Sequence, residues 1–572
     1  MGTPMAKHEF KLGGQWLMYR YLTDFEPHKV PHYRFDVVVV GGGAAGGFAA
    51  LAAADAGSSV AVVLKGEATV GNTKWAKGGI ATVLDPADSF EQHALDTIAV
   101  GCGLSESQVV HKVIEGGPDA LRKIEALGAE FDKRADGKLD LSKEGGHSFA
   151  RIVHADGDAT GFEMQRAITD ALKAHPRIHL FEDHFAIDVL TQLDGHVEGL
   201  LCLGDRQEKV VFASSHVVLA TGGAGQIYRE TTNPDIATGD GIAMALRAGA
   251  TLRDMEFYQF HPTCLYIAGA ARILISEIVR GAGGILRDKS GYRFMPDYHK
   301  QAELAPRDVV SRAIFQRMVA SDDTSVYLDL SGISKDPHKL FPTISRHCQF
   351  FGIDIAKDPI PVRPGAHYLV GGIKVDNAGR TDVPGLWAVG ECASTGLHGA
   401  NRMGSNSLLE ALVLGESTGK QVAASAVRSV PRTLTPIAPR SHPNLPEGFN
   451  LNIEDLTYSL KSAMWRQMGV QRDAANLTEL GGQLQFWMQA LAGWPREGAR
   501  VWELHNMMAV SHLATQGALE RQESRGVHSR TDYPNLHANE PFHLDQRPRF
   551  RGPGIGGIDI HKTYLSTEPQ PQ

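Results

Sequence analysis

One stretch constrains the fold more than any other: residues 35–66 have the sequence FDVVVVGGGAAGGFAALAAADAGSSVAVVLKG. Four consecutive valines predict a buried strand, the glycines a tight turn, the alanine-rich segment a helix, and VAVVL a second strand. Gly41, Gly43 and Gly46 fit the pattern GxGxxG between strand and helix. Glycines there let a pyrophosphate reach the N–H groups at the positive end of the helix. The stretch therefore predicts a βαβ unit that binds a dinucleotide; a glycine turn in an ordinary α/β fold is the alternative.

Two later segments predict further strands of the same sheet. The first has the sequence HVVLATGGAGQIY, and its apolar run ends at Gly222 and Gly223. The second has the sequence VPGLWAVGECAS and ends at Gly390 and Glu391. Open α/β sheets bind ligands at the carboxyl ends of their strands. We therefore expect Glu391 to accept a hydrogen bond from a ribose or ribityl hydroxyl, with a helix-capping acid as the alternative.

These strands favour FAD over NAD as the dinucleotide. The strand VAVVL runs into Lys65, so the acid that holds the ribose in NAD sites is missing, and Glu67 is the candidate substitute. Beyond Glu391, we expect Asn406 or Ser407 to cap the helix LLEALVLG. The N-terminal dipole of that helix would stabilise negative charge on a reduced flavin ring.

Charge and cysteine usage argue against several other classes of protein. The net charge is −8 and there is no basic stripe, so we expect no nucleic-acid binding. The five cysteines are scattered without a CxxC pair, which argues against a disulfide framework, a zinc site or an iron–sulfur cluster. Such usage suits a reducing cytoplasm. There is no apolar run of about twenty residues and no signal-peptide pattern, so we expect no membrane segment and a cytoplasmic location.

Several long motifs then occur in a specific order. They are NTKWAKGGIATVLDPADS, EGGHS, HADGDATG, QFHPT, SEIVRGAGG, LAPRDVVSRAI, AHYLVGGIKVD, TDVPGLWAVGE, GLHGANRMGSNSLLE and ESRGVHSRTDYP. With these motifs the chain resembles the succinate dehydrogenase/fumarate reductase flavoprotein superfamily, and within it the aspartate-oxidising branch. The resemblance runs from about Phe35 to Tyr533.

The resemblance implies an α/β FAD-binding Rossmann-like domain, an inserted α+β capping domain that closes over the substrate, and a C-terminal helical domain. The character of the sequence changes between Glu256 and His367, and PRDVVSRAIFQRMV is amphipathic there. A Pro-rich linker follows near Val430–Pro446. We expect these bounds: 1–34 for an N-terminal extension, 35–254 and 369–436 for the discontinuous FAD-binding domain, 255–368 for the capping domain, 437–545 for the helical domain, and 546–572 for a tail.

The resemblance assigns binding and conversion of a dicarboxylate to His261 in QFHPT, Arg307 in APRD, His367 in AHYL and Arg402 in GANRM. Two guanidinium forks match two carboxylates better than lysines would, and imidazoles add directional donors. Each residue has an ordinary alternative. These are a strand-end histidine for His261, a core residue for His367, a helix cap with Asp308 for Arg307, and a surface arginine in a loop for Arg402.

A proton relay is also implied by the resemblance. Glu277 and Arg280, spaced E-x-x-R on one helical face, resemble it, and a helix-surface ion pair is the alternative. The superfamily assigns the proton added to fumarate to the arginine at position 307. Because arginine is almost never deprotonated, neutralisation of developing charge is the alternative role. Ser276 keeps the hydroxyl of the threonine that many relatives have, as a substrate contact.

The cofactor site implied by the resemblance is larger than the glycine pattern. It comprises Gly41, Gly43, Ala44, Ala45, Gly46, Lys65, Asn72, Thr73, Gly78, Gly79, Thr221, Gly222, Gly223, Asp240, Glu391, Asn406, Ser407 and Leu408. Membrane-complex relatives attach FAD to a histidine in an SHT-type motif, where this chain has Gly71-Asn72-Thr73. We therefore expect non-covalent FAD. Lys77 and Ala282 depart from the usual AQGG and RGEGG motifs and leave local contacts open.

Three functions compete at this point. The first is oxidation of L-aspartate to iminoaspartate, with hydride passing from Cα to flavin N5 and reoxidation by O2 or fumarate; it implies coupling to quinolinate synthase and NAD biosynthesis. The second is a soluble fumarate reductase or a succinate dehydrogenase flavoprotein subunit. The third is a flavin-binding interaction protein, which the intact set of two histidines and two arginines argues against. Glu144 in EGGHS favours the first function because its carboxylate can meet the substrate ammonium; a solvated loop acid is the alternative.

Overall fold

The computed structural model describes residues 18–267, 273–427, 433–439, 450–537 and 540–565. Its central element is a parallel sheet in the order β19-β12-β3-β4-β8. The strands are Leu386–Ala388 (β19), Val217–Leu219 (β12), Val37–Val40 (β3), Val60–Val63 (β4) and Ile178–Phe181 (β8). The expectation that three segments distant in sequence share one sheet is therefore confirmed. Most of the Pro-rich segment 430–446 lies outside the described residues.

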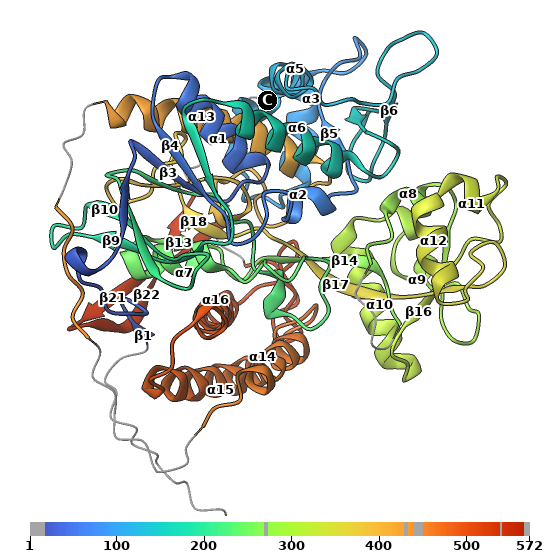
Figure 1. The fold of residues 1–572 in the computed structure, drawn as a ribbon. Helices are drawn as coiled ribbons and strands as arrows, with labels where there is room; N and C mark the ends of the chain where they lie inside the picture. The colour runs from blue at the N-terminus through green and yellow to red at the C-terminus, as the bar shows by residue number, and fades with distance from the viewer. Residues whose placement is uncertain (1–17, 268–272, 428–432, 440–449, 538–539, 566–572) are drawn as a thin grey trace, which may run out of the picture.

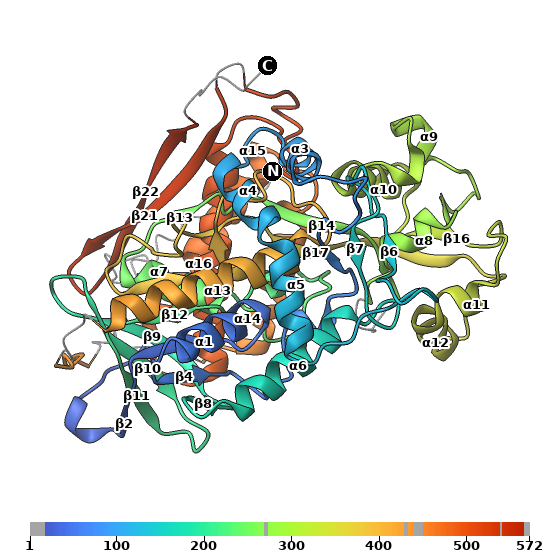
Figure 2. The same ribbon diagram turned by 90° about the horizontal axis from the view of Figure 1, so that it is seen from above.

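The four valines of β3 are buried on both sides of this sheet. Val37 and Val39 pack in one apolar cluster, and Val38 and Val40 pack in another. Burial on both faces is what a continuous apolar strand of a parallel sheet requires. One face is covered by helices α1 (Ala44–Asp55), α6 (Thr160–Ala174) and α13 (Asn406–Ala426) (Figures 1 and 2).

Helices α1 and α13 cross at close range although they lie far apart in the sequence. A Cβ on Gly415 would lie 2.6 Å from the carbonyl oxygen of Ala45, and one on Gly419 would lie 2.3 Å from that of Ala49. Glycine is therefore required at both positions of α13. The contact places the N-termini of both helices at the same edge of the sheet.

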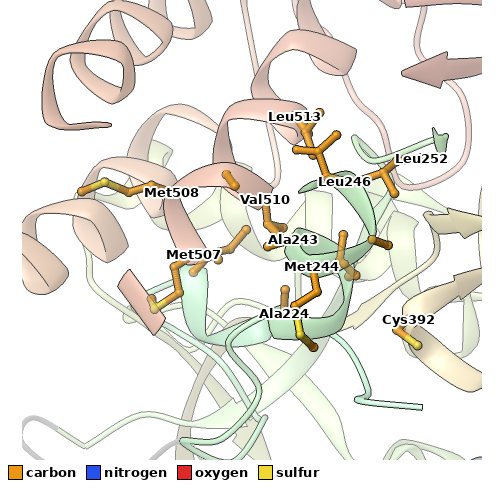
Figure 3. Packing of buried hydrophobic residues seen from close by; sticks show 14 of the residues in the cluster. Ala224, Ala243, Met244, Leu246, Leu252, Cys392, Met507, Met508, Val510 and Leu513 are labelled. Atoms are coloured by element: carbon orange, nitrogen blue, oxygen red, sulfur yellow. The ribbon is translucent and has the colours of Figure 1, made fainter. Parts of the chain in front are cut away.

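The opposite face carries a second sheet and a buried helix. The sheet has the order β2-β11-β10-β9, formed by His32–Arg34, Lys209–Ala213, Val197–Leu203 and Phe185–Thr191. The helix is α7 (Asp240–Ala248), and α16 (Ala499–Glu520) packs on it. Figure 3 shows Val510 of α16 beside Ala243 of α7, and Leu513 beside Leu246.

A lobe with its own apolar core projects from this body (green to yellow in Figures 1 and 2). Its sheet has the order β14-β17-β16-β15, formed by Tyr258–Leu265, Ile360–Leu369, Val326–Asp329 and Ile285–Arg287. Its helices are α8 (Glu277–Gly281), α9 (Met295–Tyr298), α10 (Arg307–Ser321), α11 (Pro337–Leu340) and α12 (Pro342–Phe350). The chain enters this lobe along β14 and leaves it along β17. This is the mixed α+β layout expected of an inserted capping domain.

The C-terminal part begins with helices and ends with strands. The helices are α14 (Ile453–Gln467), α15 (Ala474–Gly493) and α16, and the strands are β21 (Phe542–Arg551) and β22 (Gly554–Tyr564). The expectation of a plain tail from residue 546 is therefore wrong. Its polar sequence conceals a hairpin in which Asp545 pairs with Arg253 at 2.7 Å and Lys374 at 2.7 Å, while Phe542 and Leu544 are buried. The hairpin belongs to a sheet of order β1-β22-β21-β13-β18-β20.

Further strands and helices complete the fold. They are β1 (Met18–Tyr19), α2 (Asn72–Trp75), β5 (Ile80–Ala81), α3 (Phe90–Val100), α4 (Ser107–Glu115), α5 (Gly117–Ala126), β6 (Leu141–Ser142), β7 (Ile152–Val153), β13 (Leu252–Arg253), β18 (Gly372–Lys374) and β20 (Ala393–Ser394). Within the described ranges, no helix has the length and apolarity needed to cross a bilayer.

Candidate active site

A long cavity runs from the carboxyl ends of β3, β4, β12 and β19 to the inserted lobe. Most of the residues expected from the sequence line it. These are Gly41, Gly43, Ala44, Ala45, Lys65, Asn72, Thr73, Gly78, Gly79, Glu144, Thr221, Gly222, Asp240, His261, Ser276, Glu277, Arg307, His367, Glu391, Arg402, Ser407 and Leu408. Gly46, Gly223, Arg280 and Asn406 do not line the cavity but lie behind its wall.

The glycine turn after β3 has the shape that a pyrophosphate requires. Gly41 has φ of 108°, and a Cβ there would lie 2.2 Å from the carbonyl oxygen of Ala220. Gly46 supports the turn from behind, since its Cβ would lie 2.0 Å from the carbonyl oxygen of Gly41. Gly43 is the N-cap of α1 and offers no capping side chain; the N–H of Ala44 donates to Thr73 Oγ1 at 3.0 Å. The first turn of α1 is thus open to an anion at its positive end.

Lys65 occupies the position of the missing ribose acid, and carboxylates from distant elements surround it. Its Nζ lies 2.9 Å from Asp240 Oδ2 on α7 and 2.6 Å from Glu503 Oε1 on α16. Burial lowers the pKa of Lys65, but the two carboxylates outweigh burial and raise it. Glu67 also lines the cavity. Glu503 gave no signal in the sequence, because its partner lies more than four hundred residues away.

Glu391 lies at the end of β19, facing Asn72. Its Oε2 accepts from Asn72 Nδ2 at 3.0 Å, and its Oε1 accepts from the N–H of Leu369 at 3.1 Å. These contacts contradict the alternative of a helix-capping acid. Burial raises the pKa of Glu391. Gly223 makes room for this carboxylate, because a Cβ there would lie 2.2 Å from Glu391 Oε1.

The start of α13 differs from the sequence expectation. Asn406 and Ser407 do not cap the helix; the N-cap is Ser405, with φ of 60°, and its side chain makes no capping bond. Asn406 is held by His93 Nε2 at 3.0 Å and by Thr97 Oγ1 at 3.0 Å. Ser407 Oγ accepts from Arg402 Nη2 at 2.5 Å. Tertiary partners have overridden the usual capping preference of both residues, and the helix start remains open towards the cavity.

The buried guanidinium of Arg402 has two unused donors. Among the described residues, none accepts a hydrogen bond from its Nε or Nη1. Burial and then the charge of Arg307 lower the pKa of Arg402 to about 10. The alternative of a surface arginine in a loop is therefore wrong. The two neighbouring cations repel each other, so an anion between them would be stabilised.

The two histidines come from the neighbouring strands β14 and β17. The ring centroids of His261 and His367 lie 5.4 Å apart in a T-shaped arrangement. His261 Nδ1 accepts from the N–H of Thr263 at 3.3 Å, and His367 Nδ1 lies 2.9 Å from Thr232 Oγ1. Burial, followed by the nearby arginines, lowers the pKa of both imidazoles well below the ordinary value. Both are neutral at pH 7 and line the cavity, which neither alternative foresaw.

Thr232 is a site residue that the sequence reasoning missed. It precedes Asn233, whose Nδ2 donates to the carbonyl oxygen of His367 at 2.9 Å. Both residues line the cavity. The segment ETTNPD looks like an ordinary polar loop, and its role depends on contact with a strand about 135 residues away.

Arg307, Glu277 and Arg280 form a row in which Glu277 and Arg280 are buried and Arg307 is half-buried. Arg307 Nε donates to Glu277 Oε2 at 2.7 Å, and Arg280 Nη2 lies 3.7 Å from the same oxygen. Arg280 is 2% exposed, so the surface ion-pair alternative is wrong. Burial raises the pKa of Glu277, but Arg307 and Arg280 outweigh burial and lower it. Asp308 does not pair with Arg307; it pairs with Arg312 at 2.9 Å.

Three further expected residues have defined surroundings. Ser276 is the N-cap of α8 and accepts from the N–H of Ile278 at 3.4 Å. Of the two departures, Ala282 is exposed at the end of α8. Lys77 lines the cavity, and its Nζ lies 3.5 Å from Asp158 Oδ2.

Glu144 lies beside the arginines, buried in the cavity wall. Its Oε2 accepts from Ser405 Oγ at 2.8 Å. A Cβ on Gly404 would lie 2.6 Å from Glu144 Oε2 and 2.9 Å from Arg307 Nη2. The two groups therefore flank Gly404. Glu144 is 6% exposed, so it is not a solvated loop acid.

Comparisons with known proteins identify the families that the chain matches. Residues 36–408 match the family model described as FAD binding domain, and residues 457–547 match that of the fumarate reductase flavoprotein C-term. The chain is 42% identical to L-aspartate oxidase of Streptomyces coelicolor, over 87% of this chain and 88% of that protein. It is 43% identical to L-aspartate oxidase 1 of Ralstonia nicotianae, over 87% and 96%.

Solved structures resemble the whole molecule. The FrdA chain of E. coli quinol fumarate reductase superposes with a TM-score of 0.85 at 32% identity, covering 95% of this chain and 98% of that chain. Mycobacterium smegmatis Sdh1 has a TM-score of 0.82 at 33% identity, covering 94% and 95%.

Proposed function

The chain belongs to the L-aspartate oxidase family of FAD-dependent oxidoreductases, and from that membership we propose that it oxidises L-aspartate to iminoaspartate. The choice of L-aspartate as the substrate rests on the position of Glu144. This buried carboxylate and the guanidinium of Arg307 lie on either side of Gly404. Two arginines suit two carboxylates, and Glu144 suits the ammonium group that distinguishes aspartate from succinate.

FAD would be held by the glycine turn, Asn72, Glu391 and the start of α13. The unused Asn72 Oδ1 and Thr221 Oγ1, both buried without a partner in the described part of the chain, fit the polar edge of such a ligand. Residue 72 is asparagine, so the proposed attachment is non-covalent. When bound, FAD supplies the acceptor for the hydride that leaves Cα of the substrate.

The protein's own contribution is mainly to orient the substrate. Arg402 offers Nε and Nη1 to one carboxylate, while Arg307 and the neutral imidazoles of His261 and His367 surround the other. Neutral imidazoles donate hydrogen bonds without adding charge that would repel the ammonium. Glu144 holds that ammonium and so selects which face of Cα meets the cofactor.

In the reverse type of reaction, fumarate reduction, the chain must supply a proton. Arg307, Glu277 and Arg280 form a continuous row from the cavity into the inserted lobe. Arg307 is half-buried; burial lowers its pKa, but the charges of Glu277 and Glu144 outweigh burial and raise it. These surroundings favour a role in which Arg307 stays charged and faces the substrate, while Glu277 holds its guanidinium in place.

We further propose residence in the cytoplasm and functional coupling to quinolinate synthase, within NAD biosynthesis. The support for the location is that all five cysteines are free. Relatives of similar identity from Nicotiana tabacum carry the name chloroplastic, so a plastid is the competing location. The support for coupling is the reactivity of the product, since an imine hydrolyses in water and must be consumed quickly.

Anaerobic reduction of the bound flavin tests the proposed function. The purified holoenzyme is mixed in parallel with L-aspartate, D-aspartate and succinate, and bleaching of the flavin absorbance is followed. We expect reduction by L-aspartate alone. Reduction by succinate at an equal or greater rate would instead assign the chain to the dicarboxylate dehydrogenases.

A further inference from the structure

The aromatic ring of Tyr368 lies against the guanidinium of Arg402, the proposed contact of one substrate carboxylate. The guanidinium carbon of Arg402 is 4.8 Å from the centroid of the Tyr368 ring, and both residues line the cavity. Among the described residues, the Arg402 side chain donates one hydrogen bond, from Nη2 to Ser407 Oγ. The ring is therefore the second contact that defines the plane of the guanidinium, and a cation over a desolvated aromatic face is strongly attracted to it.

The phenol of Tyr368 is anchored away from the cavity. Its hydroxyl lies 3.3 Å from His398 Nε2 and 3.5 Å from Glu410 Oε2. The His398 ring packs edge-on against the tyrosine, with centroids 5.3 Å apart. The ring that supports Arg402 is thus fixed at its far end by polar groups of the motif GLHGANRMGSNSLLE.

Glu410 is the centre of this polar group. Its Oε2 accepts from His398 Nε2 at 3.0 Å, and its Oε1 accepts from Thr395 Oγ1 at 2.5 Å. It is 1% exposed. Burial raises the pKa of Glu410, but His398 and the hydrogen-bond donors outweigh burial and lower it. Burial also keeps the pKa of Tyr368 well above its ordinary value, so the phenol stays a donor.

None of these three side chains has a part in the chemistry proposed above. Glu410 and His398 do not line the cavity. A fully buried carboxylate is costly unless it is paired and hydrogen-bonded, and removing one partner is more costly still. Two of its hydrogen-bond donors, His398 and the Tyr368 hydroxyl, connect it with the ring that supports Arg402.

We propose that Glu410 is a positioning residue: through Tyr368 it fixes the guanidinium plane of Arg402 that receives one carboxylate of the substrate. The inference rests on the proposed function only in requiring a dicarboxylate ligand. It predicts that Glu410, His398 and Tyr368 together determine the affinity of the site for dicarboxylates. These residues should have little effect on FAD binding or on the rate of the chemical step.

The test is a titration of the holoenzyme with succinate, followed by the perturbation of the flavin absorbance. Glu410→Gln keeps the side-chain volume and should raise the dissociation constant about three- to tenfold. Tyr368→Leu removes the aromatic face and should raise it about ten- to thirtyfold. With L-aspartate, KM should rise by the same factors while kcat changes less than about threefold. The control is Glu416→Gln on the same helix, a carboxylate that pairs with Lys123 near the surface.

A double-mutant cycle distinguishes positioning from general stability. In an Arg402→Leu background, Glu410→Gln should have no further effect on succinate binding, because its route to the ligand is gone. Equal losses in both backgrounds, or an unchanged dissociation constant, would overturn the inference. If Glu410→Gln loses its flavin, Tyr368→Phe serves in the same cycle. Failure of the wild type to be reduced by L-aspartate would reject the proposed function and leave the succinate cycle valid.

Discussion

Arg307 and Glu277 form a hydrogen-bonded ion pair, 2.7 Å between Nε and Oε2, although they start two different helices of the inserted lobe. Helix α8 presents the carboxylate at its first turn and α10 presents the guanidinium at its first residue. Glu277 is buried and Arg307 half-buried, and Arg280 Nη2 lies 3.7 Å from Glu277 Oε2. An arginine held in this way has a defined direction towards the cavity.

Glu277→Gln tests whether this pair serves proton delivery. The variant keeps a hydrogen-bond acceptor for Arg307 but removes the charge that balances two arginines. We expect fumarate reduction by the pre-reduced protein to fall about 10²- to 10⁴-fold, as for loss of a general acid–base group. Succinate affinity should change far less. Stopped-flow reoxidation measures the rate, and Asp329→Asn, which breaks an ion pair with Arg287 elsewhere in the lobe, is the matched control.

Arg402→Leu and Arg307→Leu should each lose activity on both L-aspartate and fumarate while retaining FAD. Removing one partner of a desolvated charge pair costs about 2–5 kcal/mol, which corresponds to roughly 30- to several-thousand-fold. Steady-state kcat/KM and flavin content are the measurements. Arg122→Leu, which removes an exposed arginine, is the control. Near-normal efficiency in either site variant would reject its role as a carboxylate contact.

Glu144→Gln should impair the reaction of L-aspartate but not that of fumarate. A charge-assisted contact contributes about 1.5–3 kcal/mol, so the KM for L-aspartate should rise about ten- to a hundredfold. Fumarate reduction should hold steady or improve, because one negative charge near a dianion is gone. Parallel assays of both reactions measure the split. Equal losses on both would assign Glu144 a structural role through its bond to Ser405.

The cofactor should be released by acid and should be lost from a glycine-turn variant. Acid precipitation of the holoenzyme should leave yellow flavin in the supernatant, because Asn72 offers no nucleophile for attachment. Gly43→Val should purify largely without flavin. Its Cβ would lie 2.9 Å from Thr73 Oγ1, displacing the hydroxyl that binds the N–H of Ala44, and would occupy space meant for the pyrophosphate. The ratio of flavin to protein absorbance reports both results.

Several features were predictable because they depend on neighbours in the sequence. The glycine turn after β3 and the helix that follows it are formed by residues adjacent in the sequence. Arg402, His367 and Glu391 could be identified because they lie within the long motifs. The N-cap of α13 was mispredicted because Asn406 has better partners in His93 and Thr97 than its own helix offers. The hairpin from Phe542 was missed because charged residues occupy positions that pair with Arg253 across the sheet.

Alkaline pH should destabilise the protein through His543. Its Nδ1 lies 2.5 Å from buried Asp254, and its Nε2 lies 3.5 Å from Glu106. Burial lowers the pKa of His543, but Asp254 outweighs burial and raises it from 6.5 to about 9. The stabilisation is therefore complete below about pH 6.5 and is lost as pH rises to about 9, by up to about 3 kcal/mol.

Thermal unfolding midpoints between pH 6 and pH 10 measure this effect. His543→Asn should lower the midpoint at pH 6.5 and flatten its decline towards pH 9. His561→Asn, at an exposed position of strand β22, should follow the wild type. A variant His543→Asn that declines as steeply as the wild type would show that another group controls the transition.

The close crossing of α1 with α13 has a consequence for biosynthesis. The glycine turn is translated first, yet the segment that contains Glu391 and the helix that contains Gly415 reach the ribosome exit only after most of the chain has been translated. At about 5–20 residues per second, the interval between them is about 20–75 s. During that time the nascent chain has the valine-rich strands and the glycine turn but lacks Glu391 and the start of α13, so its dinucleotide site is incomplete. We therefore expect FAD to bind only after α13 has been synthesised. Truncated chains that end before α13 should be colourless and prone to aggregation.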